Sequence, residues 1–518
     1  MRIPRPPIYH AGLALFVAVL TAPAPAQLVP APERNAGEGG GPYERLAIRG
    51  CMLIDGTGGP PRGPVTILVR GNRIVSIGRF AGRADRTINA TGMYAMPGFV
   101  DMHAHLGDGK KAPRAEYVYK LWLAHGVTTV RGVPLGPHAF TKSEQARSAA
   151  NRIVAPRIFN YQRPHQFDTP QQATEWVEKM AKDGLDGLKL GAERPEIMRA
   201  LCHTAKVRGL GSVAHLAQNG VAQMNALDAA RAELRSVTHF YGHFEALLRD
   251  HTVQPYPPNH NYDDEQMRFA QAARLWDQVH PPGTPQWDAY LKAHRELGTV
   301  WCPTLAIYSA SRDLMRARTA EWHATYTLPS LWDYFQPSRK AHGSYWFDWT
   351  THDEVAWRNF YRVWMRLVND YKKLGGRITT GADAGFIYKT YGFAYIEELE
   401  MLQEAGLHPL EVIRAATMNG ALTLMEPKHR PIEFGVLRKG MLADIVLVGE
   451  NPLANLKVLY GTGHPRLNAQ DVVERVGGIR WTIKDGIVYD AKQLLADVAA
   501  MVTEEKRARA GQAADTGR

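Results

Sequence analysis

The sequence predicts an α/β protein in which a (β/α)₈ TIM-type barrel carries a small β-sandwich domain built from both chain ends. Three observations predict this fold. Strand-like apolar blocks stand near both ends of the chain, and short apolar strands alternate with amphipathic helices between them. Polar side chains also recur where the inner strands end. This alternation is typical of a parallel barrel, which displays its functional residues at the carboxyl ends of its strands.

The first predicted element is a secretory signal peptide over residues 1–26. Arg2 and Arg5 precede an apolar run, Ala11–Leu20, and the small-residue stretch Ala24-Pro25-Ala26 offers a cleavage site. The run is too short for a stable membrane span, and no later stretch is long enough, so we expect a periplasmic or secreted protein. Loss of the two arginines lowers the net charge from +11 to +9, and charges of both signs are mixed along the chain. This favours a solvated surface over a nucleic-acid partner.

The chain ends are predicted to form the β domain. Residues 27–45, rich in Pro, Gly and Glu, are expected to be a flexible leader, and residues 493–518 a charged tail. The domain itself takes residues 46–97 and 427–492. Glycine-containing turns connect its strands at Gly71-Asn72 and at Lys484-Asp485-Gly486. The expected strand segments are Leu46–Asp55, Val65–Gly78, Ala443–Val448 and Trp481–Val488.

Residues 98–426 are predicted to form the barrel. Helices are expected over Thr169–Asp183, with Thr169 as N-cap and Pro170 as first residue, and over Pro195–Arg208. The segment near 245–296 is long for a βα connection and is expected to be an insertion. The expected inner strands are Val127–Arg131, Gly187–Leu190, Ser212–His215, Ser236–Phe240, Val300–Leu305 and Ile378–Gly381.

Six candidate metal ligands follow these strands. In the segment P-G-F-V-D-M-H-A-H, Pro97–His105, the two histidines are two residues apart, so a strand directs both to the same side. His215 and His239 are 24 residues apart, which fits one strand-to-strand step. Alone, a histidine at a strand end is usually a hydrogen-bonded structural residue and an aspartate a cap. The full order indicates a metal site: His103, His105, Lys189, His215, His239 and Asp383.

These segments resemble the amidohydrolase superfamily of binuclear metal-dependent hydrolases, in particular its imidazolonepropionase- and prolidase-like branch. The resemblance covers about residues 46–490. It is carried also by G-V-T-T-V-R at Gly126–Arg131, D-G-L-K at Asp186–Lys189, G-A-D-A-G around Asp383, and Gly435–Val448. It implies two divalent metal ions, most simply zinc. By this resemblance, the more buried metal has the ligands His103, His105 and Asp383, and the more exposed one has His215 and His239.

The resemblance further implies that carbon dioxide carboxylates Lys189 and that the carbamate bridges the metals; otherwise such a lysine is a surface charge or a substrate clamp. The implied function is hydrolysis of a C–N amide bond in a peptide, an N-acyl amino acid or an aryl amide. A metal-bridging hydroxide would attack, and Asp383 would transfer the proton. Two alternatives stay open: lactone, ester or phosphoester hydrolysis at the same site, and a binding protein that has lost catalysis. A homo-oligomer is also left open.

Substrate residues are less well defined. Arg131 and His243 are candidates to stabilise an oxyanion, although His243 could instead pack against the following helix. Ala217 stands where prolidase-like relatives have a tyrosine that helps to hold a substrate carboxylate. The cysteines at 51, 202 and 302 are expected to be buried thiols, with one bridge left open. Aromatic residues that either line a pocket or pack insertion helices are Tyr256, Tyr262, Trp276, Trp287, Tyr290, Tyr326, Trp332, Tyr334, Phe335, Tyr345, Trp346, Phe347 and Trp349.

Overall fold

The computed structural model describes residues 27–338 and 346–516, so the predicted signal peptide and Tyr345 lie outside the described residues. A parallel sheet of eight strands, each paired with the next in sequence, forms the barrel. The sheet closes between its first and last strands, because the Met102 amide donates to the Thr380 carbonyl at 2.9 Å. The strands are β6 (Phe99–Ala104), β7 (Val127–Gly132), β8 (Arg157–Gln162), β9 (Gly187–Leu190), β10 (Gly211–Ala214), β11 (Ser236–Thr238), β12 (Val300–Cys302) and β13 (Arg377–Ile378).

A tyrosine fills the barrel interior. A Cβ atom at Gly187 or Gly211 would lie 2.3 or 2.0 Å from atoms of the Tyr161 side chain, so only glycine leaves room for this ring. The six predicted inner strands are confirmed, whereas β8, which carries Tyr161, was not predicted. Four strands, β10 to β13, end earlier than expected. In β11 and β12 the reason is local, because His239 and Thr304 adopt positive φ angles of 64° and 53° that turn the chain out of the sheet.

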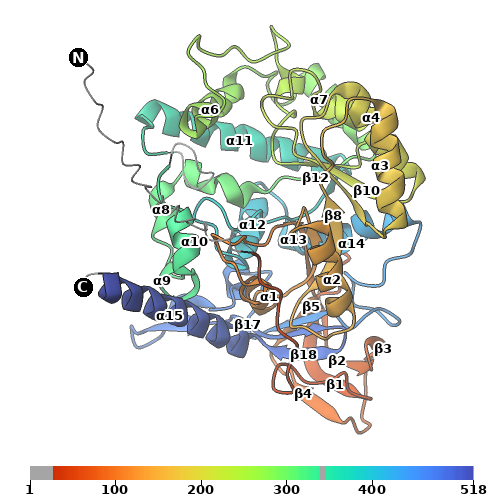
Figure 1. The fold of residues 1–518 in the computed structure, drawn as a ribbon. Helices are drawn as coiled ribbons and strands as arrows, with labels where there is room; N and C mark the ends of the chain where they lie inside the picture. The colour runs from red at the N-terminus through yellow and green to blue at the C-terminus, as the bar shows by residue number, and fades with distance from the viewer. Residues whose placement is uncertain (1–26, 339–345, 517–518) are drawn as a thin grey trace, which may run out of the picture.

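Helices cover the barrel. The predicted capping box of α3 (Pro170–Lys182) is present, since Thr169 accepts from the Gln172 amide. Both predicted helices are confirmed, and in Figure 1 α3 and α4 lie side by side on one flank of the barrel. The other covering helices are α1 (Ala115–Ala124), α2 (His138–Ala149), α4 (Pro195–Val207), α5 (Ala226–Arg231), α12 (Phe393–Glu404), α13 (Pro409–Ala416) and α14 (Met418–Met425).

Both chain ends build the β domain, as predicted. One mixed sheet runs in the order β18-β17-β14-β5-β1-β2-β3, with β4 beside β1. Figure 1 shows its red and orange strands from the N-terminal part at the lower edge, next to the blue strands. Its strands are β1 (Leu46–Leu53), β2 (Arg62–Arg70), β3 (Arg73–Gly78), β4 (Arg86–Asn89), β5 (Tyr94–Pro97), β14 (Ile445–Val448), β17 (Ile479–Lys484) and β18 (Ile487–Asp490), and a separate hairpin contains β15 (His464–Leu467) and β16 (Val473–Val476).

The leader differs from the prediction, and the predicted charged tail is helical. Residues 27–45 are not a free leader: the Val29 amide donates to the Pro113 carbonyl at 2.8 Å, and Gly40 exchanges backbone hydrogen bonds with Val488. The tail forms the helix α15 (Ala491–Thr516), which packs along α1. A buried lysine of α1 contacts both segments. Lys120 forms ion pairs with Glu38 of the leader at 2.7 Å and with Asp497 of α15 at 2.9 Å. Its charge therefore ties both segments to the barrel.

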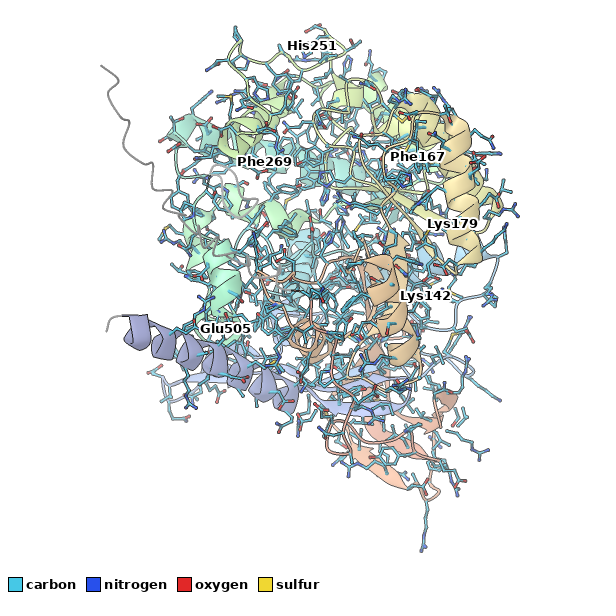
Figure 2. All side chains as sticks on the ribbon, in the orientation of Figure 1. Lys142, Phe167, Lys179, His251, Phe269 and Glu505 are labelled. Carbon is cyan, nitrogen blue, oxygen red and sulfur yellow. The ribbon has the colours of Figure 1, made fainter. Side chains whose placement is uncertain are left out.

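Two connections are enlarged. Between β11 and β12 the chain forms η1 (Glu245–Leu247), α6 (Glu265–Ala273), η2 (Arg274–Asp277) and α7 (Pro285–Glu296). In Figure 2 this segment, which carries His251 and Phe269, lies at the end of the molecule away from the β domain. Between β12 and β13 the chain forms η3 (Leu305–Ser311), α8 (Leu314–Arg318), α9 (His323–Tyr326), α10 (Pro329–Tyr334) and α11 (Thr351–Lys373). Within the described ranges, no helix has the length and apolar character needed to cross a membrane.

Candidate metal centre

Three predicted ligands meet where the first and last barrel strands end. His103 lies on β6 and His105 directly after it, while Asp383 follows β13. The Asp383 Oδ1 atom is 3.6 Å from His103 Nε2 and 3.4 Å from His105 Nε2. One ligand atom from each residue lies within 4.8 Å of the others. A single divalent ion could contact all three atoms with small side-chain adjustments.

The remaining two histidines extend this cluster. His239 Nε2 lies 3.6 Å from the second carboxylate oxygen of Asp383. The His239 ring centroid is 4.7 Å from that of His103 and 4.6 Å from that of His215. The order around the barrel mouth is therefore His105, His103, His239 and His215. The imidazole nitrogens of His239 and His215 are candidate ligands for a second ion beside the first.

Lys189 is the last residue but one of β9 and lies within the same cluster. Its side chain is fully buried, and Nζ is 3.2 Å from His103 Nε2. Burial, the main cause, and the charge of Arg163 hold the pKa of this amine well below its usual range. The neutral amine is consequently favoured, and a neutral amine has the lone pair that a charged one lacks.

Outer contacts orient the imidazoles toward the centre. His105 Nδ1 donates to the Pro134 carbonyl at 3.1 Å, while Nδ1 of His103 and of His239 are bonded to threonine hydroxyls, at 2.7 and 2.5 Å. These contacts leave Nε2 of each ring facing the cluster, as in metal-ligating histidines. Burial lowers the pKa of His103 and His105, which favours the neutral, ligating form. The donor set of imidazole nitrogen and carboxylate oxygen fits zinc and similar ions.

Asp101 is a site residue that was not predicted. Its Oδ1 accepts from the backbone amides of His103 at 2.9 Å and Ala382 at 3.1 Å, so one carboxylate connects the two ligand-bearing strand ends. Burial is the main reason that the pKa of Asp101 is raised to about 7. Strand alternation, which places Asp101 on the same side as His103, is the signal that could have identified it.

The two candidate substrate residues lie elsewhere. Arg131 is only 1% exposed inside the barrel, where Nε donates to the Met102 carbonyl at 2.7 Å and the guanidinium lies over Tyr161. His243 is also buried, with Nδ1 bonded to the Tyr290 hydroxyl at 2.6 Å and its ring against Trp301. Neither position supports direct substrate contact, and His243 takes the alternative role of packing against the following helix.

A cavity of about 280 Å³ opens beside His215. Tyr241 forms one wall and stacks on the His215 ring, with centroids 4.7 Å apart. Ala217 lines it as well, as do Tyr262 and Arg268 from the insertion. The aromatic residues of the insertion thus have both of the predicted roles. Tyr262 lines the cavity, whereas Trp287 and Tyr290 are buried where the insertion helix α7 packs against its neighbours. All three cysteines are buried and unbridged.

Comparisons with known proteins give partial sequence matches and broad structural matches. No family model matches the chain. N-acyl-D-aspartate deacylase of Alcaligenes xylosoxydans xylosoxydans is 41% identical over 119 residues, which are 22% of this chain and 22% of that protein. Dihydroorotase of Thermus aquaticus is 39% identical over 61 residues, which are 12% of this chain and 13% of that protein. The chain thus matches only about a fifth or less of the length of these curated relatives.

Solved structures match over most of the chain. The bottromycin amidohydrolase has a TM-score of 0.60 and 20% identity, covering 89% of this chain and 91% of that one. A Xaa-Pro dipeptidase with methionine bound in its active site has a TM-score of 0.56 and 18% identity, covering 86% of this chain and all of that one. At this identity the likeness shows the fold.

Proposed function

We propose that this protein is an exported, metal-dependent amidohydrolase of the prolidase-like branch, which cleaves a C–N amide bond. Its substrate would be a peptide, an N-acyl amino acid or an aryl amide. The observation that carries the proposal is the group formed by His103, His105 and Asp383, whose ligand atoms lie within 4.8 Å at the barrel mouth. The names of the partial relatives, a deacylase and a dihydroorotase, support the same class of bond.

The chain provides ligands for two ions. His103, His105 and Asp383 would hold one, and His215 and His239 the other. Bound divalent ions would supply Lewis-acid polarisation of the substrate carbonyl and an activated water near neutral pH. Zinc suits these imidazole and carboxylate donors best.

Lys189 is proposed to act as a carbamate. Its neutral amine would attack carbon dioxide, so that an N–C bond forms, one proton leaves and a carboxylate replaces the amine. The full burial of Lys189 supports this step, because burial disfavours the ammonium form that cannot attack. The new carboxylate would place two further oxygen ligands beside His103.

Asp383 is proposed to move the proton. Its Oδ1 faces His103 and His105 while Oδ2 faces His239, so the carboxylate stands at the centre of the cluster. It would accept a proton from the attacking water and deliver it to the leaving nitrogen, first as general base and then as general acid.

Metal analysis and a substrate panel test this function. The full chain, produced with zinc and bicarbonate, should carry about two divalent ions. His105→Ala should lose metal, whereas His203→Ala, at an exposed histidine paired with Glu233, should keep it. Among N-acyl amino acids, aryl amides, dipeptides and lactones, aromatic amides should be hydrolysed with a higher kcat/KM than small dipeptides such as Ala-Pro. A protein that binds no metal would contradict the proposed metal site. Hydrolysis of lactones but not of amides would contradict the proposed C–N bond cleavage.

Export has a separate test. Cleavage after Ala26 would leave Gln27 as the first residue of the mature protein. Mass spectrometry of the protein from the periplasmic or secreted fraction should find this N-terminus. A chain that keeps residues 1–26 and stays in the cytoplasm would contradict export without affecting the proposed chemistry.

A further inference from the structure

Arg163 stands at the barrel mouth, level with Lys189. In the parallel pairing of β8 with β9, Tyr161 is opposite Gly187 and Gln162 is opposite Leu188. Arg163, the residue directly after β8, therefore follows at the level of Lys189 on β9. Tyr161 points into the barrel, where it approaches Gly187. Two residues further along the chain, Arg163 faces the same side, one layer nearer to the solvent.

No protein side chain or carbonyl in the described residues is hydrogen-bonded to the Arg163 guanidinium. It is exposed, and within the described part of the chain it forms no hydrogen bond or ion pair. Glu193, in the loop after β9, is near enough for the Arg163 charge to lower its pKa, although burial raises that pKa more, and the two side chains form no ion pair in the described residues. That charge also contributes to the lowered pKa of Lys189 and of His105, as expected for a cation beside the metal centre.

Two other cations near the mouth already have partners. Lys111 is buried, donates to the Gly385 carbonyl at 3.0 Å and lies 3.3 Å from the ring centroid of Phe386. Arg268, at the cavity beside His215, forms an ion pair with Glu265. Arg163 therefore differs from both, because its donors remain available to a ligand.

We propose that Arg163 binds a free carboxylate on the amine half of the substrate. Among the proposed amides, those with a free carboxylate on the amine half are thereby the favoured substrates, and aromatic N-acyl amino acids are among them. This inference rests on the proposed amide hydrolysis. A guanidinium offers a carboxylate two parallel charge-assisted hydrogen bonds, and this replaces the carboxylate contact expected of a tyrosine at Ala217. The cavity beside His215, on the other side of Lys189, would receive the acyl half.

Matched substrates and variants of the zinc-loaded full chain test the assignment. N-acetylphenylalanine and its carboxamide differ only in the charge that Arg163 would recognise. Arg163→Met should reduce kcat/KM for the acid about 10- to 100-fold, mainly through KM, as expected for loss of charge-assisted hydrogen bonds. The carboxamide should change less than about threefold, and Arg163→Lys should recover part of the loss. Arg199→Met, at an exposed arginine on the outer helix α4, is the matched control and should change neither.

Two measurements without turnover complete the test. Zinc content should be equal in the wild type and in Arg163→Met. Equal losses on both substrates accompanied by loss of zinc would mean that Arg163 supports Lys189 instead, and would overturn the proposal.

Calorimetric titration with phenylalanine and with phenylalaninamide separates the two hypotheses. If no amide is hydrolysed but Arg163→Met weakens binding of phenylalanine alone, the carboxylate site stands and the proposed function fails. If neither titration nor turnover distinguishes Arg163→Met from the wild type, the carboxylate site is refuted.

Discussion

Replacing Arg157 by alanine should lower the free energy of unfolding by about 3–5 kcal/mol, the usual cost of removing one partner from a buried ion pair. Arg157 is the first residue of β8, and its guanidinium reaches Asp444 at 2.5 Å and Asp485 at 2.7 Å. Both acids belong to the β domain, so this contact joins the domain to the end of the barrel away from the metal centre.

The structure indicates which of the two carboxylates loses more stabilisation when Arg157 is removed. The Asp444 side chain is 1% exposed. Without Arg157, its carboxylate would still accept a hydrogen bond from the backbone amide of Asp485 at 2.9 Å, but it would have no cationic partner among the described residues. Asp485 keeps Lys484, whose Nζ lies 3.2 Å away. Burial raises the pKa of Asp485, but the charges of Arg157 and Lys484 outweigh it and lower this pKa, so the acid is ionised at pH 7. The loss is thus mainly the uncompensated charge of Asp444.

Urea unfolding at pH 7, followed by tryptophan fluorescence and by circular dichroism, measures the effect. Arg157→Ala combined with Asp444→Asn should recover part of the loss, because the stranded charge is removed as well. Arg73→Ala is the control: its ion pair with Glu433 is 40% and 49% exposed, so less than about 1 kcal/mol is expected. A loss below about 1 kcal/mol for Arg157→Ala would refute the argument that this network holds the two domains together.

Three further predictions concern the site and its insertion. Asp383→Asn should keep part of the metal but reduce kcat about 10²- to 10⁴-fold, because an amide cannot shuttle the proton; wild-type turnover would mean that another group does so. Lys189→Ala should lose metal and activity together, with partial rescue by short carboxylic acids such as propionate, whereas full activity would show that Lys189 is only a neighbour. Burial raises the pKa of Glu245 to about 7 from 4.5, so its stabilising contribution is complete below about pH 4.5 and is lost as the pH rises through about 7. Glu245→Gln should therefore unfold at higher urea concentration than the wild type at pH 8 but not at pH 5, and identical shifts at both values would contradict the linkage.

Much of the fold follows from local sequence patterns. The strands that pair in the barrel are short apolar segments, and the start of α3 follows from Thr169 and Pro170. The pairing of His103 with His105 needs only the two-residue alternation of a strand. The positions of His215, His239 and Asp383 after three different barrel strands were enough to predict one cluster, because parallel strands bring their carboxyl ends to one rim.

Other features depend on partners that are distant in the sequence. Residues 27–45 were expected to be free, but their backbone finds acceptors at Pro113 and Val488. Arg131 carries the charge expected of a substrate residue, yet it is buried with Tyr161. Composition does not reveal either result, because each depends on which surfaces the folded chain leaves available.

The sequence by itself determined the barrel, the separate β domain and the set of candidate ligands, since periodicity and residue type suffice for these. Only the tertiary structure decided that Asp101 joins the two ligand-bearing strand ends, that Arg163 stands level with Lys189, and that the insertion borders a cavity beside His215. The physical reason is that strand register and burial arise from contacts between segments far apart in the chain. A change of one residue in register would turn Arg163 away from the mouth without altering any local pattern.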